Sequence, residues 1–384
     1  MLLKSVDIQV YKLDDNGTFD LIGEIDVYTS LIWPDKYNGH ATFELNVPVN
    51  QKNNSLIKKG HIIWTGGNNA CIIEIIQSDK DDNGQKTYKV KGRTLESLLT
   101  RRILWNTCNC IDKHSSTIMY EIVDKNCVNP SDLNRKIPFL ECAIDEQIGK
   151  VVSFQKTGGE VYDVIESIAT DAGLGFDVIF NPREKKLIFK VIEGVDRTVL
   201  PASGDASNLV IFSTDLEDIL SSTYYTNDQD AKTLAYVAGE GEGAERKHVV
   251  SGDATSKGLM RRELYVDARD LQSESFGDNG VTVTISDEDY HNMLIDRGNE
   301  KLAEHTVTDS FEAEMRVVGS VQYKYGIDYD KGDKVIIQDM DLGVQVIGTV
   351  AEVSENYDDE YELVITFGYS YPTLIQKVKR QISK

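Results

Sequence analysis

The chain has 384 residues, with 41 Lys and Arg against 63 Asp and Glu, which gives a formal net charge of −22. At ~150 residues per domain, this length predicts two or three domains rather than one. Hydrophobic residues make up 40% and charged residues 27% of the sequence, so the composition excludes wholesale disorder. The acidic excess would repel a polyanion, which argues against a surface built to bind nucleic-acid phosphates.

Neither export nor a disulfide framework is predicted. The N-terminus MLLKSVDIQVYKLDD has no long apolar stretch, and no window approaches the ~18 apolar residues of a membrane helix. Five cysteines are an odd number, and we expect all of them to be reduced. The close pair Cys108-Asn109-Cys110 lacks a second pair, and His114 stands alone, so a zinc site is not expected. We predict a soluble protein made in a cytosol.

The first hundred residues are predicted to form an antiparallel β-meander. Val6, Ile8 and Val10 alternate with polar residues, and the period of two resumes over 19–27 after an Asn16-Gly17 turn. Asn-Gly between alternating segments is a strong hairpin signal because both turn positions favour positive φ. Further strands are expected at 43–47, 61–64, 71–77 and 87–90. This pattern predicts a small barrel or sandwich.

Helices and a hairpin are predicted after this meander. Apolar residues spaced by three and four predict helices over 94–104 and 116–126. A third helix is expected to follow the capping box Thr157-Gly158-Gly159-Glu160 and to stop at Gly173. A hairpin over 175–192 turns at Asn181-Pro182, and a fourth helix is predicted over 286–306.

The last segment returns to strands and resembles the first. Strands are expected at 334–338, 344–353 and 361–368. Residues 331–368 repeat the order of 59–92, in which Lys-Gly precedes a strand, a turn, a strand, an acidic turn and a strand ending in Gly. A duplication of this kind indicates two related β units, although chance similarity between two meanders stays open.

We therefore predict a mainly β fold with α+β insertions. In this multi-domain chain, two related antiparallel β-barrel-like domains are separated by mixed α/β domains. The predicted domains are an N-terminal β-barrel-like domain (1–102), an α+β insert domain (103–222), a mixed α/β domain (223–315) and a C-terminal β-barrel-like domain with a basic tail (316–384). Whether the two barrels share strands stays open at this point.

No catalytic residue, cofactor site or metal ligand is predicted. The six histidines are scattered, with no HExxH pattern, and there is no Gly-x-Ser-x-Gly elbow. Carboxylate pairs such as Glu24 with Asp26, or Asp267 with Asp270, are too common in this acidic chain to be specific. Asp328-Tyr329-Asp330 and Asp339-Met340-Asp341 lack a twelve-residue calcium loop, so we interpret both as solvated turn acids.

Two charged segments have simple interpretations. Gly239-Glu240-Gly241-Glu242-Gly243 has neither phosphate-loop spacing, and its two carboxylates would repel phosphate, so a turn or subunit-contact loop is favoured. The basic residues that follow it, 246–248, are expected to pair with nearby carboxylates. Residues 376–384 are basic and contain no acid. They are expected to be a solvated tail or to dock on an acidic neighbouring copy.

Several stretches share the pattern of one known family and cover nearly the whole chain in order. They are Tyr28-Thr29-Ser30-Leu31-Ile32-Trp33 with Tyr37-Asn38; Gly92-Arg93-Thr94-Leu95-Glu96-Ser97-Leu98-Leu99 with Arg101-Arg102-Ile103-Leu104-Trp105; Arg135-Lys136-Ile137-Pro138; Gly173-Leu174-Gly175-Phe176; Gly194-Val195-Asp196-Arg197; Ala238-Gly239-Glu240-Gly241-Glu242-Gly243; Arg261-Arg262-Glu263-Leu264-Tyr265-Val266-Asp267-Ala268-Arg269-Asp270; and Tyr329-Asp330-Lys331-Gly332-Asp333. With these stretches the chain resembles the siphophage tail-hub, or baseplate-hub, proteins. That family is related to the trimeric hub of contractile phage tails and to the hub portion of the VgrG spike.

The resemblance implies a homotrimer in the virion tail, assembled in the cytoplasm of the bacterial host. Two β-barrel domains per subunit would alternate around the axis and give a ring of six-fold appearance. The implied partners are further copies of the chain, a distal tail or tail tube protein, and tip, tape-measure or receptor-binding proteins. DNA would pass through the lumen without specific binding, and no catalytic residue or cofactor comes with the hub portion.

The sequence thus favours a structural, non-enzymatic phage tail protein. It would form the hub at the distal end of the tail tube, attach tip or receptor-binding proteins, and line or close the DNA channel. A carboxylate-lined lumen would repel passing DNA. Arg101-Arg102 and Arg261-Arg262 are candidates for contacts between subunits, with ordinary intrachain pairs as the alternative. Two other functions stay open, a cell-wall-degrading tail-tip protein and a monomeric glycan-binding module.

Overall fold

The computed structural model describes residues 6–14, 17–80, 82, 84–199, 209–213, 221–276, 282–316, 323–339, 344–358 and 361–368. Some predicted features lie wholly or partly outside these residues. They are the turn at Asn16-Gly17, the acidic turns of the two repeated segments, Met340-Asp341 and the basic tail 376–384.

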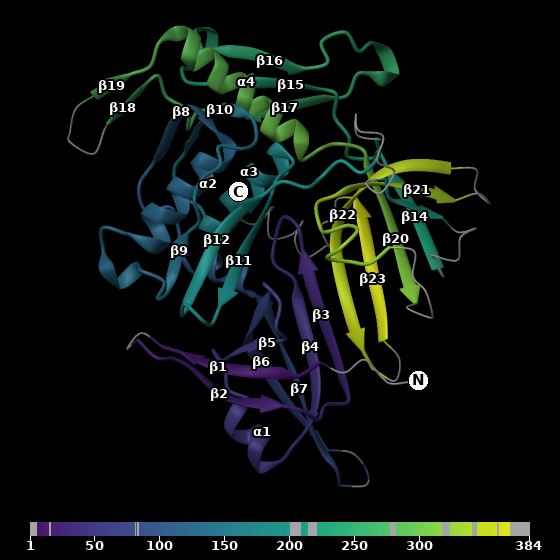
Figure 1. Cartoon of the computed structure of the whole chain (residues 1–384). Helices are drawn as coiled ribbons and strands as arrows, with labels where there is room; N and C mark the ends of the chain where they lie inside the picture. The colour runs from purple at the N-terminus through teal and green to yellow at the C-terminus, as the bar shows by residue number, and fades with distance from the viewer. Residues whose placement is uncertain are drawn as a thin grey trace.

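Both ends of the chain contribute to one 13-stranded sheet (Figure 1). The N-terminal strands are β1 (Ile8–Leu13), β2 (Phe19–Ile25), β3 (Ser30–Lys36), β4 (Thr42–Pro48), β5 (Ile62–Trp64), β6 (Ala70–Lys80) and β7 (Lys86–Thr94), with helix α1 (Gln51–Leu56) between β4 and β5. The C-terminal strands are β13 (Ile211–Ser213), β14 (Ser221–Asn227), β20 (Thr308–Arg316), β21 (Lys334–Asp339), β22 (Val344–Tyr357) and β23 (Tyr361–Gly368). The strand order is β14-β20-β23-β22-β3-β4-β7-β6-β5-β1-β2, with β21 beside β22 and β13 beside β21.

The two halves of the sheet are joined by β3 and β22, which run side by side in Figure 1. The pair is antiparallel, from Leu31 opposite Tyr357 to Lys36 opposite Glu352. Strand β3 was not predicted, because Pro34 lies within it. The Tyr37 N–H donates to Ala351 O, and bonding in an antiparallel ladder alternates, so the Pro34 nitrogen faces away from β22. The proline therefore removes no hydrogen bond from this junction.

The two repeated segments fold alike. In the first, β5, β6 and β7 are successive antiparallel neighbours, and in the second β21, β22 and β23 are. The β6–β7 register shifts between Ile73 and Ile75, and the β22–β23 register shifts between Val350 and Glu352. We call β3-β4-β7-β6-β5 the first unit and β14-β20-β23-β22-β21 the second unit, since the strand order is the same in both. The predicted relation between 59–92 and 331–368 is therefore present in the backbone.

An α+β insertion follows the first unit. Its elements are η1 (Leu95–Arg101), β8 (Cys108–His114), α2 (Ser115–Val123), η2 (Asp124–Val128), η3 (Leu133–Arg135), β9 (Leu140–Cys142), β10 (Val151–Lys156), α3 (Val161–Ala172), β11 (Gly175–Asn181) and β12 (Lys186–Ile192). The predicted hairpin over 175–192 is confirmed as β11 and β12.

Three helix predictions in this insertion need correction. Residues 95–101 form the 3-10 helix η1 rather than an α-helix. Its first five residues, Leu95 to Leu99, are all buried, so this part of the helix has no solvent face. The helix predicted over 116–126 ends as α2 at Val123 and continues as the π-helix η2. The predicted capping box does not form, because Gly158 and Gly159 take φ values of 72° and 100° and Glu160 becomes the N-cap residue of α3 without a side-chain cap.

A smaller α/β module follows β14. It contains β15 (Leu234–Ala238), η6 (Gly243–Glu245), β16 (His248–Gly252), η7 (Gly258–Met260), β17 (Glu263–Asp267), β18 (Glu274–Phe276), β19 (Thr282–Thr284) and α4 (Asp287–Ala303). The predicted helix 286–306 is confirmed as α4, whose N-cap Ser286 side chain accepts from the Asp289 N–H. Helix α4 lies across β15 and β16 (Figure 1).

The prediction of a mainly β chain with α+β insertions is confirmed. Pairing among the described strands leaves β2 and β14 at the ends of the sheet, so neither unit closes into a barrel by these hydrogen bonds. Buried apolar side chains form four clusters, centred on the insertion, the first unit, the second unit and the α4 module. The predicted domain limits stay a prediction. Among the described helices, none is long and apolar enough to cross a membrane.

Candidate functional site

Tyr37, just after β3, lies where the two units and the insertion meet. Its N–H donates to Ala351 O in β22, and the Phe176 N–H of β11 donates to Tyr37 O over 3.0 Å. Its phenol donates to Gly173 O, and the Gly194 N–H donates to the phenol oxygen, each over 3.1 Å. One aromatic residue thus connects three parts of the chain through hydrogen bonds.

Glycines allow this close approach. A Cβ added to Gly175 or to Gly332 would overlap the Tyr37 ring, and a Cβ on Gly194 would overlap the backbone of Gly332. Gly332 also has a φ of 88°, a conformation that side chains with a Cβ rarely adopt. The backbone contact at this junction therefore requires glycine at these three positions.

A buried ammonium group lies beside Tyr37. The side chain of Lys331 is 9% exposed, and its Nζ lies 2.6 Å from Asp177 Oδ1 of β11 and also contacts Asp35 of β3. Asp35 accepts a further hydrogen bond from Tyr325 over 3.1 Å. The buried carboxylate of Glu96, in η1, accepts from the Val178 N–H over 2.8 Å. Lys331 therefore neutralises carboxylates that belong to both the first unit and the insertion.

Burial and mutual interaction shift the pKa values of this cluster. Burial, reinforced by the Asp177 charge, raises the pKa of Glu96 to about 7. Burial also raises the pKa of Asp177 to about 6, although the Lys331 charge acts in the opposite direction. Burial alone would lower the pKa of Lys331, but Asp177, Asp35 and Glu96 outweigh it and raise that pKa above the ordinary lysine value. We expect Lys331 to stay charged throughout the physiological pH range.

Asp333 binds the segment that follows β12. Its carboxylate accepts from the Val195 N–H over 2.8 Å and pairs with Arg197 at 2.5 Å. Asp333 is 2% exposed, so this pair is shielded from solvent. It joins the segment after β12 to the start of β21.

Five of the stretches that carried the family resemblance thus meet here. They are 37–38, 92–99, 173–176, 194–197 and 329–333. We name the set of Tyr37, Asp35, Glu96, Asp177, Lys331 and Asp333 the three-way junction. Sequence reasoning assigned these residues no role. The glycines at 175, 194 and 332, each within a matched stretch, were the one signal that a close backbone contact was required.

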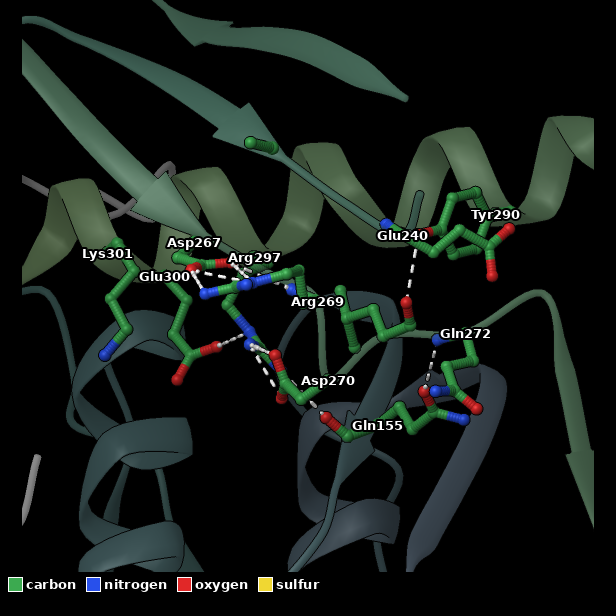
Figure 2. Close-up of polar contacts among 12 residues, drawn as sticks. Gln155, Glu240, Asp267, Arg269, Asp270, Gln272, Tyr290, Arg297, Glu300 and Lys301 are labelled. Atoms are coloured by element: carbon green, nitrogen blue, oxygen red, sulfur yellow. Dashed lines mark hydrogen bonds and ion pairs between the residues drawn. The ribbon is translucent and has the colours of Figure 1, made fainter. Parts of the chain in front are cut away.

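A second joint connects the insertion to the α4 module (Figure 2). Figure 2 shows the Arg297 side chain between Asp270 and Glu300. Arg297 pairs with Asp270 at 3.0 Å and with Glu300 at 3.3 Å, and it donates to Gln155 O of β10 over 3.1 Å. The Gln272 N–H donates to Gln155 Oε1 over 3.4 Å. We call this set the Arg297 joint.

The glycine-rich loop 239–243 is held inside the α4 module. The Glu240 N–H donates to the Tyr290 hydroxyl over 2.8 Å, and Glu240 Oε2 accepts from the Ser273 N–H over 3.0 Å. Arg246 donates to Gly239 O and pairs with Asp267, which also pairs with Arg269. The expected pairing of the basic residues after this loop with carboxylates is confirmed for Arg246 and for Lys247, which pairs with Glu240 and Asp287.

The carboxylate pairs named from the sequence are occupied by other interactions. Asp26 pairs with Lys52, and Glu24 accepts from Gln9. Hydrogen bonds from Arg269 and Arg246 lower the pKa of Asp267 to about 2, and Asp270 pairs with Arg297. A general acid at neutral pH needs a raised pKa, so Asp267 is unsuited to that role.

The candidate arginine pairs contact partners within the chain. Arg101 lies 3.7 Å from Glu74, Arg261 pairs with Glu263 and Arg262 pairs with Asp228. Arg102 donates to Arg101 O and Lys136 O. These side chains therefore have intrachain partners, and their contribution to contacts between subunits stays a prediction.

No metal cluster is found in the described part of the chain. All five cysteines are free, and Cys108 Sγ lies 3.7 Å from Cys110 Sγ. Within the described ranges no group of three or more His, Cys, Asp or Glu side chains is placed to hold a metal ion. A pocket lies at the Arg297 joint, between β10 and α4, and its lining includes Lys150, Asp296 and Glu300.

Solved structures share this fold over nearly their whole length. A tail protein from Neisseria meningitidis MC58 is 11% identical, with a TM-score of 0.54 over 95% of this chain and 97% of that chain. The prophage tail protein gp18 from Listeria monocytogenes EGD-e is 11% identical, with a TM-score of 0.54 over 99% and 98% of the two chains. The 43 kDa tail protein of prophage MuSo2 from Shewanella oneidensis is 12% identical, with a TM-score of 0.52 over 94% and 97%.

The fold is therefore that of phage tail proteins. No curated protein sequence matches the chain. Over residues 7–369, however, the sequence matches the family described as Siphovirus ReqiPepy6 Gp37-like protein, and the chain belongs to that family. The siphovirus family match and the fold shared with phage tail proteins agree with the resemblance found in the sequence.

Proposed function

We propose that the chain is the structural hub at the distal end of a phage tail tube, where three copies form a ring. The ring attaches tip, tape-measure or receptor-binding proteins and contacts the distal tail or tail tube protein. DNA passes through its lumen during ejection. The protein acts by assembly, in the virion tail, after synthesis in the bacterial cytoplasm.

The repeated unit is the observation that carries this proposal. Two units with the same strand order lie next to each other in one sheet, joined by β3 and β22. Three chains then supply six similar units, which matches the six-fold symmetry expected of a tail tube. A monomeric binding protein has no need of this duplication.

The three-way junction supports a rigid ring. Tyr37 and Lys331 connect both units to the insertion with buried hydrogen bonds and ion pairs. A polar cluster of this kind, with its groups satisfied, fixes one arrangement of the parts. We infer that the insertion and the α4 module project from the ring in one fixed orientation and offer surfaces to other tail proteins.

The net charge of −22 fits a wall past which DNA moves. An acidic surface repels the DNA backbone and so prevents adsorption during ejection. A basic or neutral lumen in the assembled ring would contradict this part of the proposal.

Labelling within the particle tests the location. Gold-labelled antibody against this chain should bind at the distal end of intact tails, and particles that lack the chain should have no tail tip. Labelling along the tail shaft would contradict the hub. Purified protein should not clear bacterial cell walls, whereas clearing that is lost when one Asp or Glu is substituted would favour the enzymatic alternative.

A further inference from the structure

Each unit contains one long strand, β6 in the first and β22 in the second. We call the second half of each strand, toward its C-terminal end, its outer half. The outer halves of β6 and β22 differ in which strands pair with them. The first half of β22 pairs with β21 and its second half pairs with β3, while β23 lies along the opposite edge. The first half of β6 pairs with β5, and β7 lies along its opposite edge. For residues 76–80 of β6, the edge opposite β7 has no strand partner among the described residues.

A second edge without a strand partner in the described ranges belongs to β14. This strand pairs with β20, and no other described strand pairs with it. It is the second unit's counterpart of β3, since both strands have seven residues and both lie outside the equivalent pairs, β4–β7 and β20–β23. Strand β3, which pairs with the outer half of β22 within the chain, therefore corresponds to β14, which lies at the far end of the sheet and has β20 as its one partner among the described strands.

We propose that β14 of a second copy of this chain pairs with the outer half of β6. This inference rests on the proposed ring and specifies its subunit interface. The β3–β22 junction inside each chain is the template, and the β14–β6 junction repeats it between chains. Contacts of this head-to-tail kind close after three chains and give six units in one continuous ring of sheet.

The register follows from positions that correspond in the two units. Gly60 and Gly332 both take positive φ, and their N–H groups donate to Ile73 O and Val350 O. The Ile73 and Val350 N–H groups donate in turn to His61 O and Asp333 O. The corresponding positions, first unit then second, are Ile73 and Val350, Gly92 and Phe367, Thr42 and Ser310, and Ser30 and Ser221.

Transferring the β3–β22 register to the new junction fixes its pairs. In the β3–β22 junction, Leu31 lies opposite Tyr357 and Asp35 lies opposite Val353. At the proposed β14–β6 junction, the corresponding pairs are Ser222 opposite Lys80 and Thr226 opposite Ile76. Ser78 then lies opposite Tyr224, and Asp79 opposite Thr223. In the β3–β22 junction, the Tyr37 N–H donates to Ala351 O, and hydrogen-bonded pairs alternate with non-hydrogen-bonded pairs along an antiparallel ladder. In the transferred register, Ser78–Tyr224 is therefore a hydrogen-bonded pair and Asp79–Thr223 is a non-hydrogen-bonded pair.

Cysteine pairs test this register in the full-length protein. Asp79→Cys combined with Thr223→Cys should give disulfide-linked dimers and closed trimers on mild oxidation, because Cα atoms in such a pair are ~4.5 Å apart. The matched control, Asp79→Cys with Ser222→Cys, shifts the register by one residue and places the thiols on opposite faces. It should cross-link at least about tenfold less. Gln77→Cys with Tyr225→Cys provides a second in-register pair should the first fail to fold.

A proline variant tests the free edge without cysteines. The Ser78 N–H points away from β7 in this register, so Ser78→Pro removes a bond of the new junction and none of the β6–β7 ladder. Ser78→Pro should abolish the trimer while leaving the folded monomer, and Ser78→Thr should keep the trimer. A trimer that persists in Ser78→Pro, or cross-links equally in both registers, overturns the strand pairing but leaves the trimeric hub. Absence of any trimer from the unmodified protein overturns both.

Discussion

Lys331 Nζ lies 2.6 Å from Asp177 Oδ1, so the second unit and the insertion are linked by a nearly buried ion pair. Asp35, from the first unit, contacts the same ammonium. Three segments that are distant in the sequence therefore share one cation.

Removing the Lys331 ammonium group should lower the free energy of unfolding. Lys331→Met leaves Asp177 and Asp35 without their counter-ion, and we expect the free energy of unfolding to fall by about 3 to 5 kcal/mol. Lys58→Met is the matched control, because Lys58 is exposed, and it should change stability by less than about 0.5 kcal/mol. Chemical denaturation measures both. Equal effects of the two substitutions would show that the cluster does not hold the parts together.

Glu96 predicts a specific pH dependence. Its pKa is raised to about 7, so the folded chain binds this proton more tightly than the unfolded chain, and stability from this group falls as pH rises from about 5 to 8. Glu96→Gln keeps an oxygen to accept from Val178 N–H and removes the titration. Between pH 5 and pH 8 the unmodified protein should lose roughly 2 to 3 kcal/mol more stability than Glu96→Gln. Parallel stability curves for the two proteins would contradict the assignment.

Gly332 should tolerate no side chain. Gly332→Ala brings a methyl group into the Tyr37 ring in a left-handed backbone conformation. We expect a loss of roughly 3 to 5 kcal/mol in unfolding free energy. Gly66 also has positive φ but is surrounded by open space, so Gly66→Ala should cost only about 1 kcal/mol. Comparing the thermal unfolding of the two variants distinguishes the effect of overlap with Tyr37 from the effect of backbone strain.

The Arg297 joint should determine how firmly the α4 module is attached. Arg297→Met removes the hydrogen bond to Gln155 O and leaves Asp270 unpaired by arginine. Amide hydrogen exchange in α4 and β10 should become faster while the first unit is unaffected. Arg269→Met, which removes an exposed pair with Asp267, should leave exchange unchanged. Uniformly faster exchange across the chain would indicate general destabilisation instead.

Local patterns predicted fewer than half of the described strands, together with the two later helices α3 and α4. Alternation identified β1, β2, β4 and β7, and in β4 and β7 the alternate residues are buried. The Ser286 cap and the Gly173 stop set limits of α4 and α3. Strand β3 was missed because its proline is tolerated only through its position against β22. The failed capping box shows that two glycines with positive φ override a local capping pattern.

The junction could not be predicted in the same way. Tyr37, Asp177 and Lys331 are far apart in the sequence, and a lysine in a polar stretch has no local sign of burial. The family resemblance selected the stretches that contain them, but only the tertiary structure shows that these stretches meet. The β22–β3 pairing likewise joins opposite ends of the chain, and no periodicity within either strand encodes that choice of partner.

Native mass spectrometry of the purified chain tests the central claim most directly. The hub predicts a species of three times the 43.0 kDa chain mass, with dimers only as minor species. A mass of one chain at every concentration up to the solubility limit would contradict the trimeric ring, and with it the hub.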